Sequence, residues 1–339
     1  MQTTTHTGLP GVILLVVALT VSPGLSAQAV AVRNDAPRVG QQEVLMLRHA
    51  FLEKGGYQTW YEASREGVWP WFEKIGARIV GDWQVVHPDG GSEYPHLDEA
   101  WRLARYASYE HWQATRPSRS AAAGQTGGSD LLGGNGPDQR KSNASIARRR
   151  TVARGSKGGI FLQGYMAETR PIYMPGSGEA FRQVTGGGST DSNAIAVRHD
   201  VARPNEDFLA LMYWKIRKGS FEEFHALTRD GIYPFMEKIG VRPVGQWQVL
   251  YLPDGVPVES PEYDEVYLLA RYASYAHYLA TQRPGQLGGN GGDFEAFQAA
   301  LRRRQPLTLE FSTQFLQGPL YASPPLYMPA LNESYRRID

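Results

Sequence analysis

Residues 65–86 read REGVWPWFEKIGARIVGDWQVV, and residues 229–250 read RDGIYPFMEKIGVRPVGQWQVL. Thirteen of the 22 aligned positions are identical. Chance does not produce such agreement between two stretches of one chain. The sequence therefore indicates that the same structural unit occurs twice, and that the residues on either side of each stretch complete one unit.

The first part of each repeated stretch belongs to a long helix. Its apolar residues recur with a period near 3.6, which buries one face of a helix. Pro70 and Pro234 lie inside this pattern, and a proline there removes a backbone donor and clashes with the preceding turn. We therefore expect a kink beside Gly67 and Gly231. In the second copy the apolar residues are Phe221, Phe224, Ile232, Phe235, Met236 and Ile239.

Each helix is followed by the rest of a repeating unit. Gly76 and Gly240 are placed to end the helices, because glycine tolerates the left-handed conformation at C′. Strands rich in Val, Ile and Trp follow at 78–87 and 242–252. Ser274 is a candidate N-cap for a second helix. With the flanking strands, each copy reads strand, helix, strand, strand, helix, strand, which is the βαββαβ pattern of ferredoxin-like units.

The repeat sets the expected organisation, an α+β chain with two units. We expect unit 1 at residues 43–175, a linker rich in Gly, Ser, Thr and Asn at 176–206, and unit 2 at 207–329. Residues 293–304 form an amphipathic helical pattern, whereas residues 139–167 contain seven basic residues and no acidic one. We therefore expect the last helix of unit 1 to be degraded or partly disordered.

Composition excludes several classes of function. The 339 residues include no cysteine, which excludes disulfides, thiolate catalysis and Cys-ligated zinc. A net charge of +1 provides no long-range attraction for nucleic acid, so we expect no nucleic-acid partner. An apolar run at 11–21 is too short to span a bilayer and predicts a signal peptide over residues 1–29. We expect a secreted or periplasmic protein that is not an integral membrane protein after signal cleavage.

A family resemblance rests on three motifs of the second copy. Residues 218–240, KGSFEEFHALTRDGIYPFMEKIG, with VGQWQV and LLARYASYAHY after them, resemble the NIPSNAP family of the dimeric α/β-barrel superfamily. The resemblance covers residues 43–175 and 207–329. It implies a ferredoxin-like unit, and it supplies no catalytic residue that can be placed on this chain.

The expected packing of each unit predicts the same architecture. A four-stranded sheet with both helices on one face leaves its other face uncovered, and a second sheet can cover that face. Two copies within one chain hold the second sheet at an effective concentration of about millimolar or more. We therefore predict that two ferredoxin-like units form an intramolecular dimeric α/β-barrel.

The first candidate ligand-binding residues are Arg105 and Tyr106, with Arg271 and Tyr272 in the second copy. Neighbouring residues of a strand point to opposite faces, so one of each pair faces the barrel. An arginine in a barrel cavity could bind a carboxylate or an enolate, and a tyrosine could donate a proton to it. In the alternative interpretation the arginine pairs with a helix carboxylate such as Glu73, and the tyrosine belongs to the core.

Two further pairs of residues are candidates. Trp83 and Trp247 would line a cavity for a flat apolar ligand, or pack as ordinary core. His111 and His277 could act as bases, but a cationic histidine is disfavoured near a helix N-terminus, which favours a neutral surface or capping role. No spacing of His, Asp or Glu predicts a metal site, and we expect no cofactor.

These residues support three functional hypotheses. The first is a protein that binds a small apolar or aromatic ligand or a protein partner. The alternative is an enzyme, either a cofactor-independent monooxygenase or an isomerase, as the resemblance to the superfamily implies. The third is a structural module with a filled barrel. Arg or His in a cavity favours the enzyme, whereas apolar walls alone favour binding.

Overall fold

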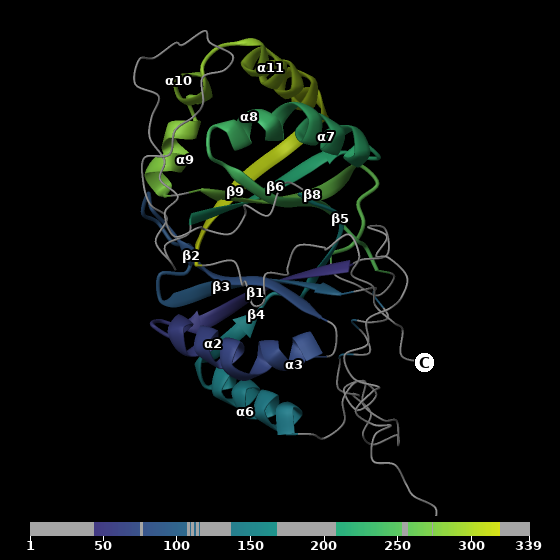
Figure 1. Cartoon of the computed structure of the whole chain (residues 1–339). Coiled ribbons are helices and arrows are strands. Elements are labelled where there is room, and N and C mark those ends of the chain that lie inside the picture. Colours follow the sequence, from purple (N-terminus) through teal and green to yellow (C-terminus); the bar gives the residue numbers. More distant parts are fainter. Residues whose placement is uncertain are drawn as a thin grey trace, which may run out of the picture.

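A computed structural model of the chain describes residues 44–74, 77–106, 109, 112, 115, 137–167, 208–252, 257–272 and 274–318. The expected signal peptide, the expected linker and His111 lie outside these residues. Residues 44–167 are called half 1 and residues 208–318 half 2. Figure 1 shows the two halves stacked, with a layer of helices at the top and at the bottom and the strands between them.

Both halves contain a strand, an interrupted helix, two strands, a helix and a last strand in the same order, with β4 added in half 1 and α9, α10 and η4 added in half 2 among the described residues. Half 1 contains β1 (Val44–Glu53), α2 (Tyr57–Ala63), η1 (Ser64–Val68), α3 (Trp69–Lys74), β2 (Arg78–Val86), β3 (Leu97–Tyr106), α6 (Pro137–Val152), β4 (Ala153–Ser156) and β5 (Ile160–Met166). Half 2 contains β6 (Phe208–Arg217), α7 (Phe221–Leu227), η3 (Thr228–Ile232), α8 (Tyr233–Lys238), β7 (Arg242–Val249), β8 (Tyr263–Tyr272), α9 (Tyr275–Thr281), α10 (Pro284–Gly288), α11 (Gly292–Arg304), η4 (Gln305–Leu307) and β9 (Thr308–Gln317). None of the helices described is long and apolar enough to cross a membrane.

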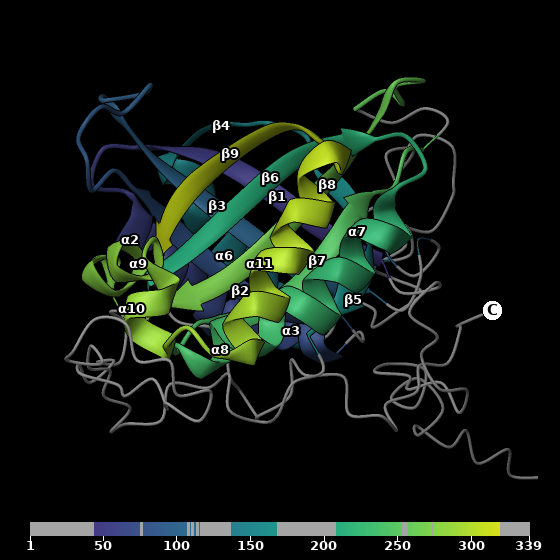
Figure 2. The same ribbon diagram turned by 90° about the horizontal axis from the view of Figure 1, so that it is seen from above.

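All strands of the nine-stranded sheet except β4 close into a ring. In Figure 2 the strands β6 and β9 of half 2 cross over β1 and β3 of half 1. The order is β3-β2-β9-β6-β8-β7-β5-β1, with β1 pairing back to β3, and the neighbours are antiparallel. Each half ends in a strand that pairs with the other half, since β5 pairs with β7 and β9 with β2. The prediction that both copies close one barrel within a single chain is therefore confirmed.

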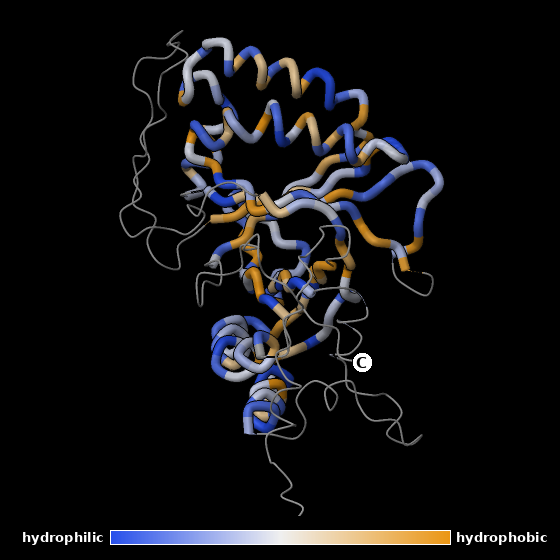
Figure 3. The backbone as a smooth tube through the Cα atoms, turned by 45° about the vertical axis from the view of Figure 1, so that its right-hand side comes forward, coloured by the Kyte–Doolittle hydropathy of each residue, from blue (hydrophilic) through white to orange (hydrophobic). Residues whose placement is uncertain are grey.

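Side chains from both halves fill the barrel. Eight strands leave an interior that side chains can fill. Figure 3 shows hydrophobic residues concentrated in the strands between the helical layers. Residues that alternate with this interior set face the helices and form separate core clusters in each half. The interior cluster consists of Leu45, Leu47, Val80, Trp83, Val85, Trp101, Leu103, Leu162, Leu209, Leu211, Val244, Trp247, Val249, Leu269 and Leu316.

A π-helical turn interrupts the long helix of each half where the sequence predicts a kink. The turns η1 and η3 contain Gly67 and Gly231. Pro234 then lies in the first turn of α8, where its missing N–H removes no helical hydrogen bond. A Cβ at Gly231 would lie 2.4 Å from the Cβ of Ala300, so the glycine also permits the close approach of α11.

The expectation of a degraded last helix in half 1 is wrong, because α6 is a regular helix of 16 residues. It packs on α2, η1 and α3. Polar contacts are prominent: the Arg149 guanidinium lies 3.6 Å from the centroid of the Trp60 ring, and Arg148 pairs with Glu62 and Glu66. Ile146 and Val152 add apolar contacts with the core of half 1. A search for hydrophobic periodicity misses a helix that packs through arginine.

Ser274 caps α9, as the sequence predicts. Its Oγ accepts a hydrogen bond from the backbone N–H of His277 at 3.1 Å. We expect Ser274→Ala to lower the free energy of unfolding by about 1 kcal/mol, measured by urea denaturation. Ser274→Asp keeps an acceptor and should retain most of the stability. Equal losses in the two variants would show that the cap contributes little.

Candidate functional site

Four of the sequence-predicted residues lie inside the barrel. Trp83 and Trp247 are buried in the interior cluster. Arg105 lies directly opposite Leu45 in the β1–β3 pair, and Arg271 holds the matching place in half 2. Since directly paired residues share a face of the sheet, both arginines face the interior rather than the helices. Both are buried.

The remaining predicted residues that the structure describes face the helices. Tyr106 and Tyr272 are buried between sheet and helices in their respective halves. His277 is also buried, and its Nε2 donates a hydrogen bond to the carbonyl of Ile239 at 2.7 Å. This histidine therefore holds α9 against the end of α8 and does not lie at the surface.

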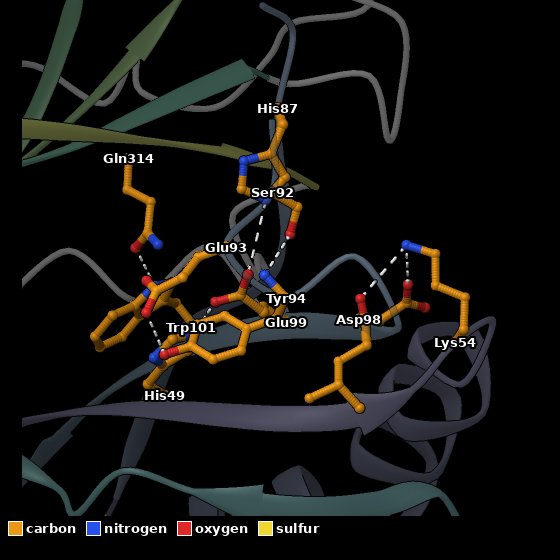
Figure 4. A network of polar contacts seen from close by, with 11 residues as sticks. His49, Lys54, His87, Ser92, Glu93, Tyr94, Asp98, Glu99, Trp101 and Gln314 are labelled. Carbon is orange, nitrogen blue, oxygen red and sulfur yellow. Dashed lines mark hydrogen bonds and ion pairs between the residues drawn. The ribbon is translucent and has the colours of Figure 1, made fainter. Parts of the chain in front are cut away.

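A polar network occupies one end of the barrel interior (Figure 4). Glu99 is buried, with Oε2 at 2.8 Å from Nε2 of His49 and Oε1 at 3.7 Å from Nε2 of His87. The His49 ring stacks on Trp101 with centroids 4.3 Å apart. Trp101 Nε1 donates to Oε1 of Gln314, from half 2, at 2.5 Å. The network therefore links the two halves.

Burial sets the protonation states of this network. Burial lowers the pKa of His49 to about 4, and the positive charge of Lys157 acts in the same direction. Burial raises the pKa of Glu99, while the charges of His87 and Lys157 oppose this rise. At neutral pH His49 is a neutral imidazole beside a carboxyl group that holds its proton more tightly than usual.

Half 2 places tyrosines where half 1 has histidines. Tyr213 and Tyr251 donate hydrogen bonds to the two oxygens of Glu265, at 2.7 and 3.0 Å. Burial raises the pKa of both tyrosines, so they stay protonated donors at neutral pH. An even number of antiparallel steps separates β1 from β6 in the ring, so both networks lie at the same end of the barrel.

The two glutamates are not among the residues predicted from the sequence, although the repeat contains a signal for them. Glu99 and Glu265 hold matching positions, six residues before Arg105 and Arg271 respectively. An even spacing in a strand places two residues on one face. The barrel therefore has carboxylates toward one end of its interior and arginines toward the other.

A cavity of about 150 Å³ lies between the sheet and the helices of half 2. It is on the opposite face of the sheet from the barrel interior, where Trp83 and Trp247 are packed. Tyr272, a predicted residue, is part of its wall. Three of its lining residues, Thr228, Tyr233 and Arg304, carry polar groups, although the exposed wall is almost wholly apolar. Its apolar wall includes Met212, Met236, Leu268, Ala270, Phe297 and Leu301.

The equivalent layer of half 1 contains charged side chains. The pair Arg48 and Arg102 occupies the register position that Met212 and Leu268 occupy in half 2. Both arginines act on the buried Asp82, whose pKa burial raises to about 6 against the opposing charges of the arginines. Two of the exchanges between the halves, Arg48 to Met212 and Arg102 to Leu268, thus replace charged side chains by apolar ones.

Comparisons with known proteins give structural neighbours only. No family model and no curated protein sequence matches the chain. A putative monooxygenase from Fusobacterium nucleatum is similar in structure at 8% identity and a TM-score of 0.42, covering 82% of this chain and 93% of that one. An anthrone oxidase-like protein is similar at 9% identity and a TM-score of 0.39, covering 82% and 91%.

The structural neighbours also include NIPSNAP-domain proteins. One from Burkholderia xenovorans is 19% identical, with a TM-score of 0.24, and covers 32% of this chain and 91% of that one. These identities and TM-scores support no transfer of activity.

Within the ranges that the structure describes, no group of three or more His, Asp or Glu residues could hold a metal ion.

Proposed function

We propose that the protein binds a small apolar or aromatic molecule in the cavity of half 2. The observation that carries this proposal is the apolar wall of a cavity of about 150 Å³. An apolar cavity of about 150 Å³ accommodates a molecule the size of benzene. Small-molecule sites combine apolar walls with a few polar groups that orient the ligand, and Arg304, Tyr233 and Thr228 are such groups here.

The proposal includes the organisation of the chain. We propose that each half is a ferredoxin-like, NIPSNAP-like unit, and that residues 1–29 direct export to a secreted or periplasmic location. The repeated stretch and the matching strand orders β5-β1-β3-β2 and β9-β6-β8-β7 support the first part. The apolar run at 11–21 supports the second.

A cofactor-independent monooxygenase or isomerase is the second candidate. It is favoured by the arginine and the tyrosine at the same cavity, because a cation and a hydroxyl donor in a dry site can stabilise an enolate. Turnover of an enolisable aromatic ketone that is lost in Arg304→Met would favour the enzyme. Binding without turnover would favour the first candidate.

Ala270→Leu tests the binding site directly. The added side chain would extend from β8 into the cavity, so we expect it to abolish the binding of 4-fluorotoluene, measured by 19F NMR titration. Leu268→Ala enlarges the same cavity and should admit a larger ligand such as naphthalene. Equal 4-fluorotoluene affinity in the wild type and Ala270→Leu would place the ligand elsewhere and contradict the proposal.

A further inference from the structure

Arg304 lines the cavity of half 2, and its guanidinium has no carboxylate partner among the residues described. Nη1 of Arg304 donates to the hydroxyl of Thr228 at 3.1 Å. Its guanidinium lies over the rings of Phe224 and Trp214, 4.6 and 5.1 Å from the centroids. Burial lowers the pKa of Arg304 to about 10, so the side chain stays cationic at neutral pH. Arg304 is half-buried, and a cation partly withdrawn from water is stabilised by an anion beside it.

A second polar group at this cavity also has no partner. Tyr233 is buried, and its hydroxyl makes no hydrogen bond within the described part of the chain. The positive charge of Arg304 opposes the rise that burial causes in the pKa of Tyr233, so the two groups lie within electrostatic reach of each other. A buried donor without an acceptor is unfavourable, and an acceptor on a ligand would relieve that cost.

Half 1 shows how the same arrangement is compensated internally. Arg149 lies over the ring of Trp60 in α2, as Arg304 lies over Phe224 at the matching position of α7. Burial and the charges of Arg102 and Arg48 lower the pKa of Arg149, and the buried carboxylate of Asp82 opposes them. Half 1 therefore supplies the anion from its own sheet.

Half 2 has lost that anion. Gln246 pairs with Leu268 in the register in which Asp82 pairs with Arg102. The amide of Gln246 carries no charge, and its Oε1 lies 2.9 Å from Nδ1 of His225. The arginine is thus retained, its carboxylate is replaced, and an apolar cavity lies beside it.

We infer that the ligand of this cavity is a small apolar or monocyclic aromatic molecule with one anionic oxygen group, a carboxylate or an enolate. Arg304 is its counter-ion, Tyr233 donates a hydrogen bond to it, and the apolar wall holds the ring. This inference rests on the proposed function, since it names the chemical class of ligand for the same cavity.

The test compares two ligands of similar size on the full-length protein. 4-Fluorobenzoate carries the anion, and 4-fluorotoluene replaces it by a methyl group; both are followed by 19F NMR at pH 7. We expect the benzoate to bind at least tenfold more tightly. Arg304→Met should abolish this preference while 4-fluorotoluene binding remains. Tyr233→Phe should weaken benzoate binding severalfold and leave toluene binding unchanged.

Arg303→Met is the matched control, because Arg303 is the preceding residue of α11, carries the same charge and is exposed. It should leave both affinities unchanged. If 4-fluorotoluene binds but the benzoate binds no more tightly, the anion is wrong and the proposed function stands. If neither ligand binds, the proposed function itself fails. If Arg304→Met does not fold, the wild type and Tyr233→Phe still test the inference. A wild-type protein that does not prefer the benzoate overturns the inference. A preference that Tyr233→Phe leaves unchanged overturns the role of that hydroxyl.

Discussion

Gly81→Ala is expected to lower the free energy of unfolding by about 1–3 kcal/mol, and Trp83→Ala by about 3–5 kcal/mol. A Cβ at Gly81 would lie 2.2 Å from Cζ2 of the Trp83 indole, two residues further along the same strand. The indole is fully buried inside the barrel, so it has no free space into which it can move. Urea denaturation of each variant measures the loss.

A double variant separates this contact from a general intolerance of alanine. Once Trp83 is alanine, the methyl group at position 81 has lost its nearest neighbour, so we expect the two losses to be non-additive. Gly245→Ala is the contrasting case, because its Cβ would also lie 2.7 Å from the backbone carbonyl of Tyr165. Removing Trp247 should therefore not restore that variant. An equal cost of Gly81→Ala with and without the indole would contradict this account.

The titration of His49 should give the second large effect. Its pKa in the folded state is about 4, below the ordinary value of 6.5, so the unfolded chain takes up the proton first as the pH falls. The stability that neutral His49 contributes is complete above pH 6.5 and is lost between pH 6.5 and 4, with a slope of up to about 1.4 kcal/mol per pH unit. His49→Gln should lack this loss, as measured by urea denaturation across that range.

Glu99 contributes with the opposite sign. Because burial raises its pKa in the folded state, the stability that it contributes declines as the pH rises above its ordinary value of 4.5. Comparing His49→Gln and Glu99→Gln with the wild type therefore separates the two groups. Nitrogen-15 NMR of the imidazole reports the His49 pKa directly. Parallel stability curves for the wild type and His49→Gln would show that this histidine is not held neutral by burial.

The barrel could be predicted because the repeated stretch contains the residues that interrupt and end its helix. Glycine and proline act through backbone geometry, so Gly67 and Pro70 indicate an interrupted helix whatever surrounds them. The positive φ of 89° at Gly240 agrees with the predicted helix end. The order of elements, together with the need to cover a bare sheet face, then predicts a closed barrel.

The last helix of half 1 and the candidate site depend on information that periodicity does not contain. Helix α6 packs through Arg149 and through small serines, and arginine is read as a surface residue unless its aromatic partner is known. The cavity of half 2 depends on Met212 and Leu268, which differ from their counterparts in half 1 by charge. The sequence shows that difference in charge. Only the pairing of β6 with β8 shows that Met212 and Leu268 lie side by side in the wall of the cavity.

The exchange of final strands between the halves affects the chain during its synthesis. Val86 of β2 pairs with Phe315 of β9, the last strand of the barrel. During synthesis the edge of β2 therefore stays unpaired until β9 has left the ribosome. Open sheet edges recruit other chains. Nascent or prematurely terminated polypeptides that lack β9 should therefore self-associate. A chaperone that covers the unpaired edge of β2 during synthesis should reduce this self-association.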